Sequence, residues 1–403
     1  MWERFWTPRR RRDYPLLLFG LLLVWWAGFN VYREVTGGKY GSDFVVFYAA
    51  SGATLDGVPE EAYDAQSILK YELEVSADQK ADPFRYPPPY LLLLAPLALL
   101  PYGLALCAWL GLTAAALAAT VRESLRPRWW WAFPVAVFPA VAMNVAAGQN
   151  GFLTAALIGS GLTLVDRRPR TAGLLFGCLM YKPQFLAVAL LGLVIGRRWN
   201  ALLWASGCVV ALWIVSYLIL GQASWEAFWA FGSDSVDAVY AGSISDSRIS
   251  ALAFGVSLGL PRVVSQALHV ATAALATILV GRVWIRETRP AVRNSVTVLG
   301  TILVSPYVFG YDLAMLIPVL GWLVSDARQR GWPTGQPLIL GVCLCAPLAS
   351  WPIASATHFQ FGWLAIAALA ANVAFCSAAA VPQGPTQKEV ERARVGDVCT
   401  RDL

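Results

Sequence analysis

Charged residues are scarce in this chain. They make up 14% of its 403 residues, whereas 57% are hydrophobic, and the mean hydropathy is +0.55. A soluble domain carries about 25% charged residues. The shortage extends along most of the sequence, which excludes a soluble globular enzyme and predicts an all-α protein that crosses a membrane many times. The apolar segments are continuous runs of Leu, Ala and Val, which is a helical pattern.

Metal ligands and nucleotide motifs are also lacking. Six of the seven cysteines lie in apolar segments and none lies in a long polar loop, so we expect no disulfide framework. Neither of the two histidines has a metal-ligand spacing to another His, Cys or Glu. No Walker loop, G-x-S-x-G, H-E-x-x-H or G-x-G-x-x-G opening a helix is present. We therefore expect no metal and no cofactor.

The amino terminus lacks a cleavable signal. A basic arm (1–13) precedes a long apolar run with no A-x-A-like site, so Tyr14 to Val35 reads as a retained first crossing. From there the hydropathy pattern predicts about twelve crossings in one transmembrane domain (14–380), both ends cytoplasmic, and a polar cytoplasmic tail (381–403). A short broken pair of helices is expected within 129–149.

Two long polar loops are expected on the outer side. The first, 36–85, should contain amphipathic helices, and the second covers 221–261. After the first loop, Tyr90 to Leu100 reads as a short crossing inwards and Tyr102 to Val121 as a crossing outwards.

The charges support this path. The inner turns with the amino-terminal arm hold 16 bases and five acids, and the two outer loops hold 13 acids and five bases. This is the positive-inside pattern, so the net charge of +6 indicates orientation in a membrane and not nucleic-acid binding. The segment RESLRPR (122–128) is an exception, because the predicted path puts its three arginines outside.

Polar residues gather at one predicted depth, the outer membrane boundary. This set predicts an outward-facing site and comprises Asp43, Arg85, Tyr86, Gln149, Asn150, Lys182, Gln184, Asp246, Arg248, Tyr307, Tyr311, Asp312 and His358. Nothing comparable gathers at the inner boundary, where most charges are arginines in short turns.

Several of these residues have a second interpretation. Asp43 could simply cap the helix expected from Phe44, although a cap can also act in catalysis. Lys182 could reach lipid headgroups or meet a phosphate. Arg85 could be an ordinary interface anchor. Asp312 opens a crossing with no base near it in sequence, and an unpaired acid at that depth suggests function.

Four segments, taken in order, resemble a known family. SDFVVFYAASGATLDG, FRYPPPYLLLLAPLALLP, the stretch from GQNG to YKPQ, and SPYVFGYDLAMLIPVL look like the polyprenyl-phosphate-mannose-dependent mannosyltransferases of glycosyltransferase family 87. The resemblance covers roughly residues 15–330. It implies the GT-C membrane fold, a polyprenyl monophosphate sugar donor, periplasmic transfer with inversion, and no obligatory metal.

The resemblance also implies roles for individual residues. Asp43 matches the acid that serves as general base, Lys182 matches a lysine near the donor phosphate, and Gln149 a polar position at the edge of the site. Many relatives have a histidine near Asp312, where this chain has Tyr311.

The sequence thus favours a glycosyltransferase of a bacterial inner membrane, acting on a lipid- or glycan-linked acceptor. A transporter or flippase is the alternative, and a membrane scaffold a third possibility. Transporters tend to show internal repeats and polar residues at mid-bilayer, and neither pattern is found here.

Overall fold

A computed structural model describes residues 41–75, 81–125, 138–234, 248–286 and 289–379. The regular secondary structure of these residues is helical, apart from one isolated bridge between Arg248 and Phe309, and turns or irregular segments join the helices. The all-α prediction is therefore confirmed for this part of the chain. Three described helices are long and apolar enough to cross a membrane, and seven apolar helices are shorter. The expected first crossing, the basic arm and the polar tail lie outside the described residues.

Most of the described helices form one bundle. Prolines begin α10, α11 and α16, where the missing N–H of proline costs nothing. The bundle consists of α6 (Tyr102–Leu125), α9 (Gly151–Leu164), α10 (Pro169–Gly177), α11 (Pro183–Ile195), α15 (Arg262–Arg286), α16 (Pro290–Val304), α17 (Leu316–Arg330), α18 (Gln336–Thr357) and α19 (Gly362–Ala379).

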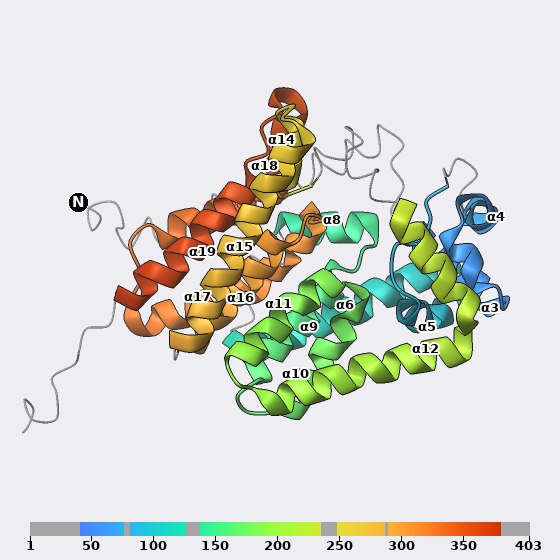
Figure 1. Ribbon diagram of the computed structural model, residues 1–403, viewed down its shortest axis with the longest axis horizontal. Coiled ribbons are helices and arrows are strands. Elements are labelled where there is room, and N and C mark those ends of the chain that lie inside the picture. Colours follow the sequence, from blue (N-terminus) through green and yellow to red (C-terminus); the bar gives the residue numbers. More distant parts are fainter. Residues whose placement is uncertain (1–40, 76–80, 126–137, 235–247, 287–288, 380–403) are drawn as a thin grey trace, which may run out of the picture.

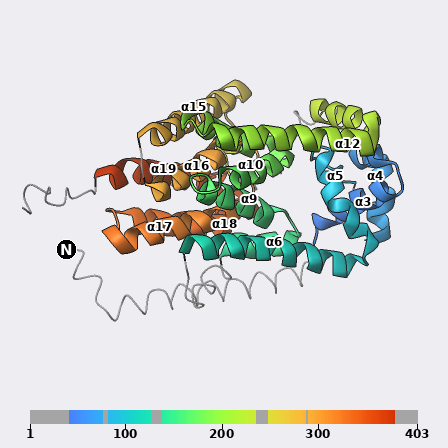
Figure 2. The ribbon, with the colours of Figure 1, turned by 90° about the horizontal axis from the view of Figure 1, so that it is seen from below.

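A second group of helices covers one end of this bundle. It contains α3 (Phe44–Leu55), α4 (Ala65–Val75) and α5 (Pro89–Leu94), with 3-10 turns at Pro59–Tyr63 and Ala95–Leu99. The long helix α12 (Trp199–Asp234) runs from the bundle to this group, bends at Gly221, and packs Phe228 against Tyr63 (Figures 1 and 2). The two predicted outer loops therefore meet.

The helices of the first loop differ from one another. Helix α3 was expected to be amphipathic, but eight of its 12 residues are buried, including Phe44, Val45, Val46 and Phe47 in succession. That prediction is wrong for α3, which is enclosed by neighbours on nearly all sides. Helix α4 is amphipathic and turns Ile68 and Tyr71 inwards.

The predicted crossing at Tyr90 to Leu100 is also wrong. Helix α5 (six residues) and the 3-10 turn after it (five residues) span about 19 Å, whereas the hydrocarbon layer is about 30 Å thick. The hydroxyl of Tyr48 donates to Leu100 O at 2.8 Å, and that of Tyr102 to Gly41 O at 2.9 Å. The chain therefore reaches α6 at the end of the bundle where α3 lies, and the count of twelve loses one crossing.

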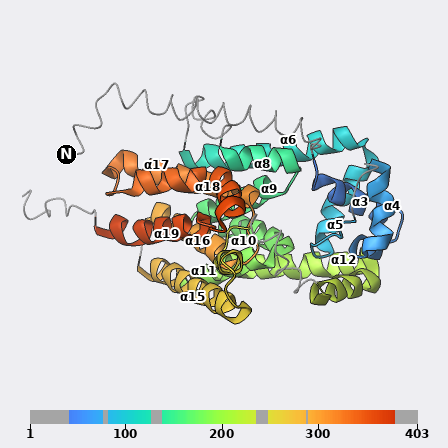
Figure 3. The same cartoon turned by 90° about the horizontal axis from the view of Figure 1, so that it is seen from above.

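Helix α6 consequently crosses in the direction opposite to the prediction. It runs beside α9, with Trp109 bonded to Gly148 O near the start of both helices, and Thr120 bonded to Ser160 further along. It lies on the side of the bundle opposite α12 (Figures 2 and 3). Arg122 thus lies at the same end as the arginine-rich turns. It is the one arginine of RESLRPR (122–128) that the structure describes, and it no longer departs from the positive-inside pattern.

Two short helices complete the described fold, α8 (Pro139–Ala147) against the start of α3 and α14 (Ala251–Ser257) beside α15 and α18 (Figure 1). Helix α8 is the described part of the expected broken pair, and it ends at Gly148 in the left-handed region. Helix α14 is capped by Ser250, whose hydroxyl accepts from Ala253 N. Below, the end of the bundle that carries Asp43 is called the Asp43 end, and the end that carries Asp166 the Asp166 end.

Candidate functional site

The backbone around Asp43 is held in place by the end of α8, about 100 positions further along the chain. Its N–H donates to Ala147 O at 3.0 Å, and the N–H of Gly41 donates to Ala146 O at 2.8 Å. Gly148 follows with a φ of +69°, and a Cβ there would lie 2.5 Å from the Cβ of Phe44. Glycine is therefore required for α8 to end against the start of α3.

The Asp43 carboxylate does not cap α3. The residue has helical backbone angles and makes no capping hydrogen bond with its side chain. Oδ2 instead accepts from Gln149 Nε2 at 3.1 Å, and Oδ1 accepts from Ser42 Oγ at 3.1 Å. Burial raises the pKa of Asp43 above its ordinary value, and the bonds from Gln149 and Ser42 partly offset this. The capping interpretation is thus wrong, and the carboxylate is available to a ligand.

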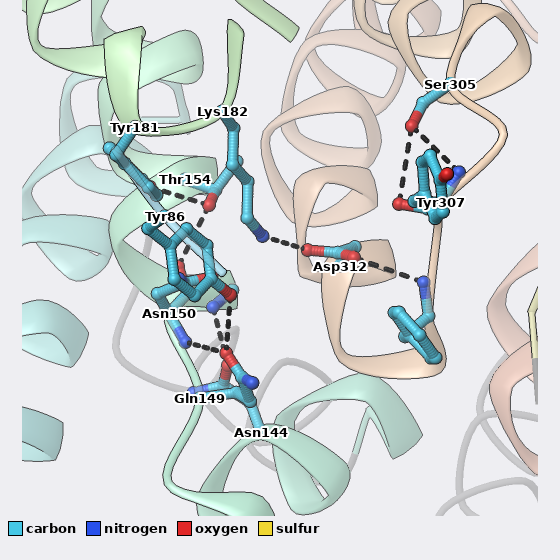
Figure 4. Close-up of polar contacts among 12 residues, drawn as sticks. Tyr86, Asn144, Gln149, Asn150, Thr154, Tyr181, Lys182, Ser305, Tyr307 and Asp312 are labelled. Atoms are coloured by element: carbon cyan, nitrogen blue, oxygen red, sulfur yellow. Dashed lines mark hydrogen bonds and ion pairs between the residues drawn. The ribbon is translucent and has the colours of Figure 1, made fainter. Parts of the chain in front are cut away.

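Gln149 connects Asp43 to the next residues of the predicted set. Its Oε1 accepts from the Asn150 N–H at 3.1 Å and from the Tyr86 hydroxyl at 3.4 Å (Figure 4). These bonds fix which way the amide points, so that its NH₂ group faces Asp43. Asn144, one turn before the end of α8, accepts from Gly151 N at 2.7 Å and holds the start of α9.

Three tyrosines form the wall behind this amide. The rings of Tyr90 and Tyr181 stack at 4.6 Å between centroids with an interplanar angle of 12°, and the ring of Tyr86 lies 4.9 Å from that of Tyr90. The Tyr181 hydroxyl is bonded to Thr154 Oγ1 at 2.8 Å. Burial raises the pKa of Tyr86, so its hydroxyl stays protonated and can donate to Gln149.

Lys182 follows Tyr181 directly and forms a buried ion pair. Its Nζ lies 2.5 Å from Asp312 Oδ1, and the two residues are 5% and 2% exposed (Figure 4). Asp312 Oδ2 also accepts from Phe309 N at 3.1 Å. The expectation that Asp312 is unpaired is therefore wrong. Its partner lies 130 positions away, and a single buried charge would be far more costly than the pair.

Two arginines supply the other positive charges. Arg85 is exposed and bonded to Asp82 at 2.6 Å. Arg248 is buried, with its guanidinium 5.2 Å from the ring centre of Tyr307 and 5.9 Å from that of Phe309. Burial lowers the pKa of Arg248, and the positive charge of Arg85 lowers it further.

Tyr311 lies beside the buried ion pair, with its ring centre 5.8 Å from Lys182 Nζ. Burial raises the pKa of its hydroxyl, and the negative charges of Asp312 and Asp43 add to the effect. Asp43 and Lys182 thus lie at the same end of the bundle, connected through Gln149, Tyr86 and Tyr181. Asp246, another predicted member, lies outside the described residues.

Two predicted residues have no described contact with this cluster. Gln184 lies half-buried in the first turn of α11, and His358 is exposed at the end of α18 with a φ of +58°. Sequence reasoning missed Tyr90, Thr154 and Tyr181 as members. Tyr90 and Tyr181 stand within the quoted motifs YPPPY and YKPQ, which was the signal that could have identified them.

Comparison with known proteins agrees with the motifs in this cluster. The model of glycosyltransferase family 87 matches residues 84–306, which include Tyr86, Gln149 and Lys182. The chain belongs to glycosyltransferase family 87. It is therefore a glycosyltransferase, and the transporter, flippase and scaffold hypotheses are set aside.

This glycosyltransferase is also similar to a curated protein of Mycobacterium tuberculosis (strain CDC 1551 / Oshkosh). That relative is a polyprenol-phosphate-mannose-dependent alpha-(1-2)-phosphatidylinositol pentamannoside mannosyltransferase, 30% identical over 298 residues, which cover 66% of this chain and 67% of the relative. No solved structure matches the chain.

Proposed function

We propose that this family 87 enzyme transfers a mannosyl group from a polyprenyl-phosphate donor to a lipid- or glycan-linked acceptor. The relative's dependence on polyprenol-phosphate-mannose supports the donor and the sugar. The hydrogen bond from Gln149 to Asp43 carries the proposal for the site, because it leaves a half-buried carboxylate oriented next to aromatic and cationic side chains.

Asp43 acts as the general base. Transfer with inversion needs one carboxylate to take the proton of the acceptor hydroxyl while the phosphate leaves from the opposite face of the sugar. Burial makes the Asp43 carboxylate more basic than an exposed one, and the bonds from Gln149 to Oδ2 and from Ser42 to Oδ1 orient it toward the acceptor. The proton ends on Asp43 and the new glycosidic bond forms at the acceptor oxygen.

The leaving polyprenyl phosphate is stabilised by cations. Arg85 is exposed and close to Asp43 electrostatically, so we assign it the first contact with the phosphate, and Arg248 adds charge from the second loop. Lys182 is already neutralised by Asp312, so a direct contact with phosphate requires that pair to open. With these cations present, we propose that no metal or cofactor is needed.

The orientation follows from charge. The Asp43 end carries the acidic loop, and the Asp166 end carries the arginine-rich turns. The positive-inside pattern therefore supports a periplasmic site in a bacterial inner membrane, with membrane lipids around the bundle.

The test is transfer of radiolabelled mannose from polyprenyl-phosphate-mannose by membranes that contain the full chain. We expect a labelled lipid or glycan product in the absence of a divalent cation and in the presence of EDTA. No transfer to any fraction of the cell envelope, with polyprenyl-phosphate-glucose active instead, would contradict the choice of sugar. Loss of transfer in EDTA, restored by a divalent cation, would contradict the metal-independent mechanism.

A further inference from the structure

A polar cavity lies at the opposite end of the bundle from Asp43. Its volume is about 390 Å³, and its lining residues come from the turn after α9, the start of α16 and the end of α17. Helix α9 separates the two sites, because Asn150 precedes its first residue and Asp166 follows its last turn; its 14 residues span about 21 Å. This cavity is therefore distinct from the candidate active site.

Arginines dominate the charge of this cavity. Arg167, Arg289 and Arg330 line it, one from each of the three segments. Both lining acids are paired with arginines. Asp326 lies 3.6 Å from Arg289 and 3.4 Å from Arg330, two of the lining arginines, and Asp166 is bonded to Arg198 and Arg293.

The guanidiniums of Arg198 and Arg293 lie 2.6 Å and 2.8 Å from the two oxygens of Asp166. Burial opposes ionisation of this acid, but Arg293 and Arg198 hold the pKa of Asp166 below its ordinary value. Asp166 therefore stays ionised and keeps both guanidiniums at the cavity. The lining thus holds three arginines and two carboxylates, and two further arginines lie against Asp166 behind it, which leaves an excess of positive charge.

The remaining lining groups suit an anion with several oxygen atoms. Among the described residues Arg167 has no ion-pair partner, and its side chain is exposed at the cavity. Ser325, Gln329 and Asn294 add hydrogen-bonding side chains, and Trp322 closes the wall by donating to Thr163 Oγ1 at 3.3 Å. Helix α16 also begins here at Pro290, with no side-chain cap, so its positive end faces the cavity.

We propose that this cavity binds a phosphate-bearing anion, which Arg167, Arg289 and Arg330 grip from three segments. Guanidinium forks match phosphate oxygens, and three of them from separate elements suit a group with more than one negative charge. The volume exceeds what one phosphate needs and is within the range of small-ligand pockets. The phosphate belongs either to the headgroup of an anionic lipid or to a soluble phosphate ester.

The binding test uses the full-length protein in detergent and inorganic pyrophosphate as the probe, measured by isothermal titration calorimetry. We expect saturable binding that chloride at matched ionic strength does not reproduce. Arg167→Gln should weaken it about three- to ten-fold, the effect of one charge-assisted hydrogen bond at an accessible site. Arg168→Gln is the matched control, because Arg168 is the next residue, is exposed and does not line the cavity.

A second variant adds charge instead of removing it. Gln329→Glu places a carboxylate in the lining at an exposed position and should weaken pyrophosphate binding without affecting folding. Equal affinity in the wild type, Arg167→Gln and Gln329→Glu, or a heat signal that chloride reproduces, would overturn the proposal.

Nanodiscs identify the source of the phosphate. The same titration is repeated in nanodiscs of phosphatidylcholine and in nanodiscs of phosphatidylcholine with phosphatidylglycerol. If pyrophosphate binds more weakly in the second membrane than in the first, and Arg167→Gln removes this difference, the cavity binds the headgroup of an anionic lipid. Equal binding in both membranes, still sensitive to Arg167→Gln, assigns it to a soluble phosphate ester.

Discussion

Gln149 Nε2 lies 3.1 Å from Asp43 Oδ2, although the two residues are 106 positions apart. The amide thereby determines the orientation of the carboxylate that we assign as the base, and its own orientation is determined by Tyr86 and the Asn150 N–H. Substitutions of Asp43 and of Gln149 test this relationship.

Asp43→Asn should reduce mannosyl transfer by roughly 10²- to 10⁴-fold, the usual contribution of a general base. Asn has nearly the same shape, so the protein should still insert and fold, as judged by its yield and thermal midpoint in detergent. Asp56→Asn, the same substitution at the other end of α3, is the control and should keep most activity. Transfer near the wild-type rate in Asp43→Asn would remove this residue from the mechanism.

Gln149→Leu should shift the acid limb of the pH–activity profile to higher pH. A base must be deprotonated, so activity is lost as pH falls through the folded-state pKa of Asp43, which burial already raises. Removing the Gln149 bond removes an effect that lowers this pKa, so the pKa rises further. The measurement is kcat/KM against pH, with Gln66→Leu on the exposed face of α4 as control. An unmoved limb, or a shift to lower pH, would show that the amide does not act on the base.

The buried pair of Lys182 and Asp312 should behave as a unit. Lys182→Met or Asp312→Leu alone leaves an uncompensated buried charge, which costs about 3–5 kcal/mol. The double substitution removes both charges and should recover at least half of the lost thermal midpoint. The double-mutant cycle is measured by thermal unfolding in detergent, with Lys70→Met and Glu61→Leu, an ion pair that is only partly buried, as the control. Strictly additive losses would contradict direct coupling.

Gly148→Ala should impair both stability and activity. The residue has a φ of +69°, and the added Cβ would meet Phe44 Cβ at 2.5 Å, so the end of α8 must move away from α3. The expected cost is about 1–3 kcal/mol, and Gln149 should lose its position against Asp43. Gly103→Ala in α6, where a Cβ meets nothing within 4 Å, is the control and should be neutral or stabilising. A Gly148→Ala protein with unchanged midpoint and kcat would contradict this packing argument.

Much of the architecture could be predicted from composition. Long apolar runs identified a helical membrane protein. The break at Gly221 was also expected, since the second loop was predicted to begin there. These features are local: each depends on the residues of one segment and the hydrocarbon around it.

The direction in which a segment crosses the membrane, and whether protein or lipid surrounds it, could not be predicted in the same way. An apolar run such as Tyr90 to Leu100 shows that a segment avoids water, but not whether lipid or protein surrounds it. The structure places it against α3, and this reverses α6 and brings Arg122 to the Asp166 end. The hydropathy of a segment is the same whichever way it crosses the membrane, so only contacts between segments could decide the direction of α6.

The sequence by itself determined the class of protein, its family motifs and the residue types of the site, because these depend on composition and on short ordered patterns. Only the tertiary structure decided that Asp312 pairs with Lys182 and that Asp43 faces Gln149 instead of capping its own helix. The physical reason is distance along the chain. Electrostatic pairing depends on spatial separation, and partners more than a hundred positions apart leave no periodicity from which the pairing could be read.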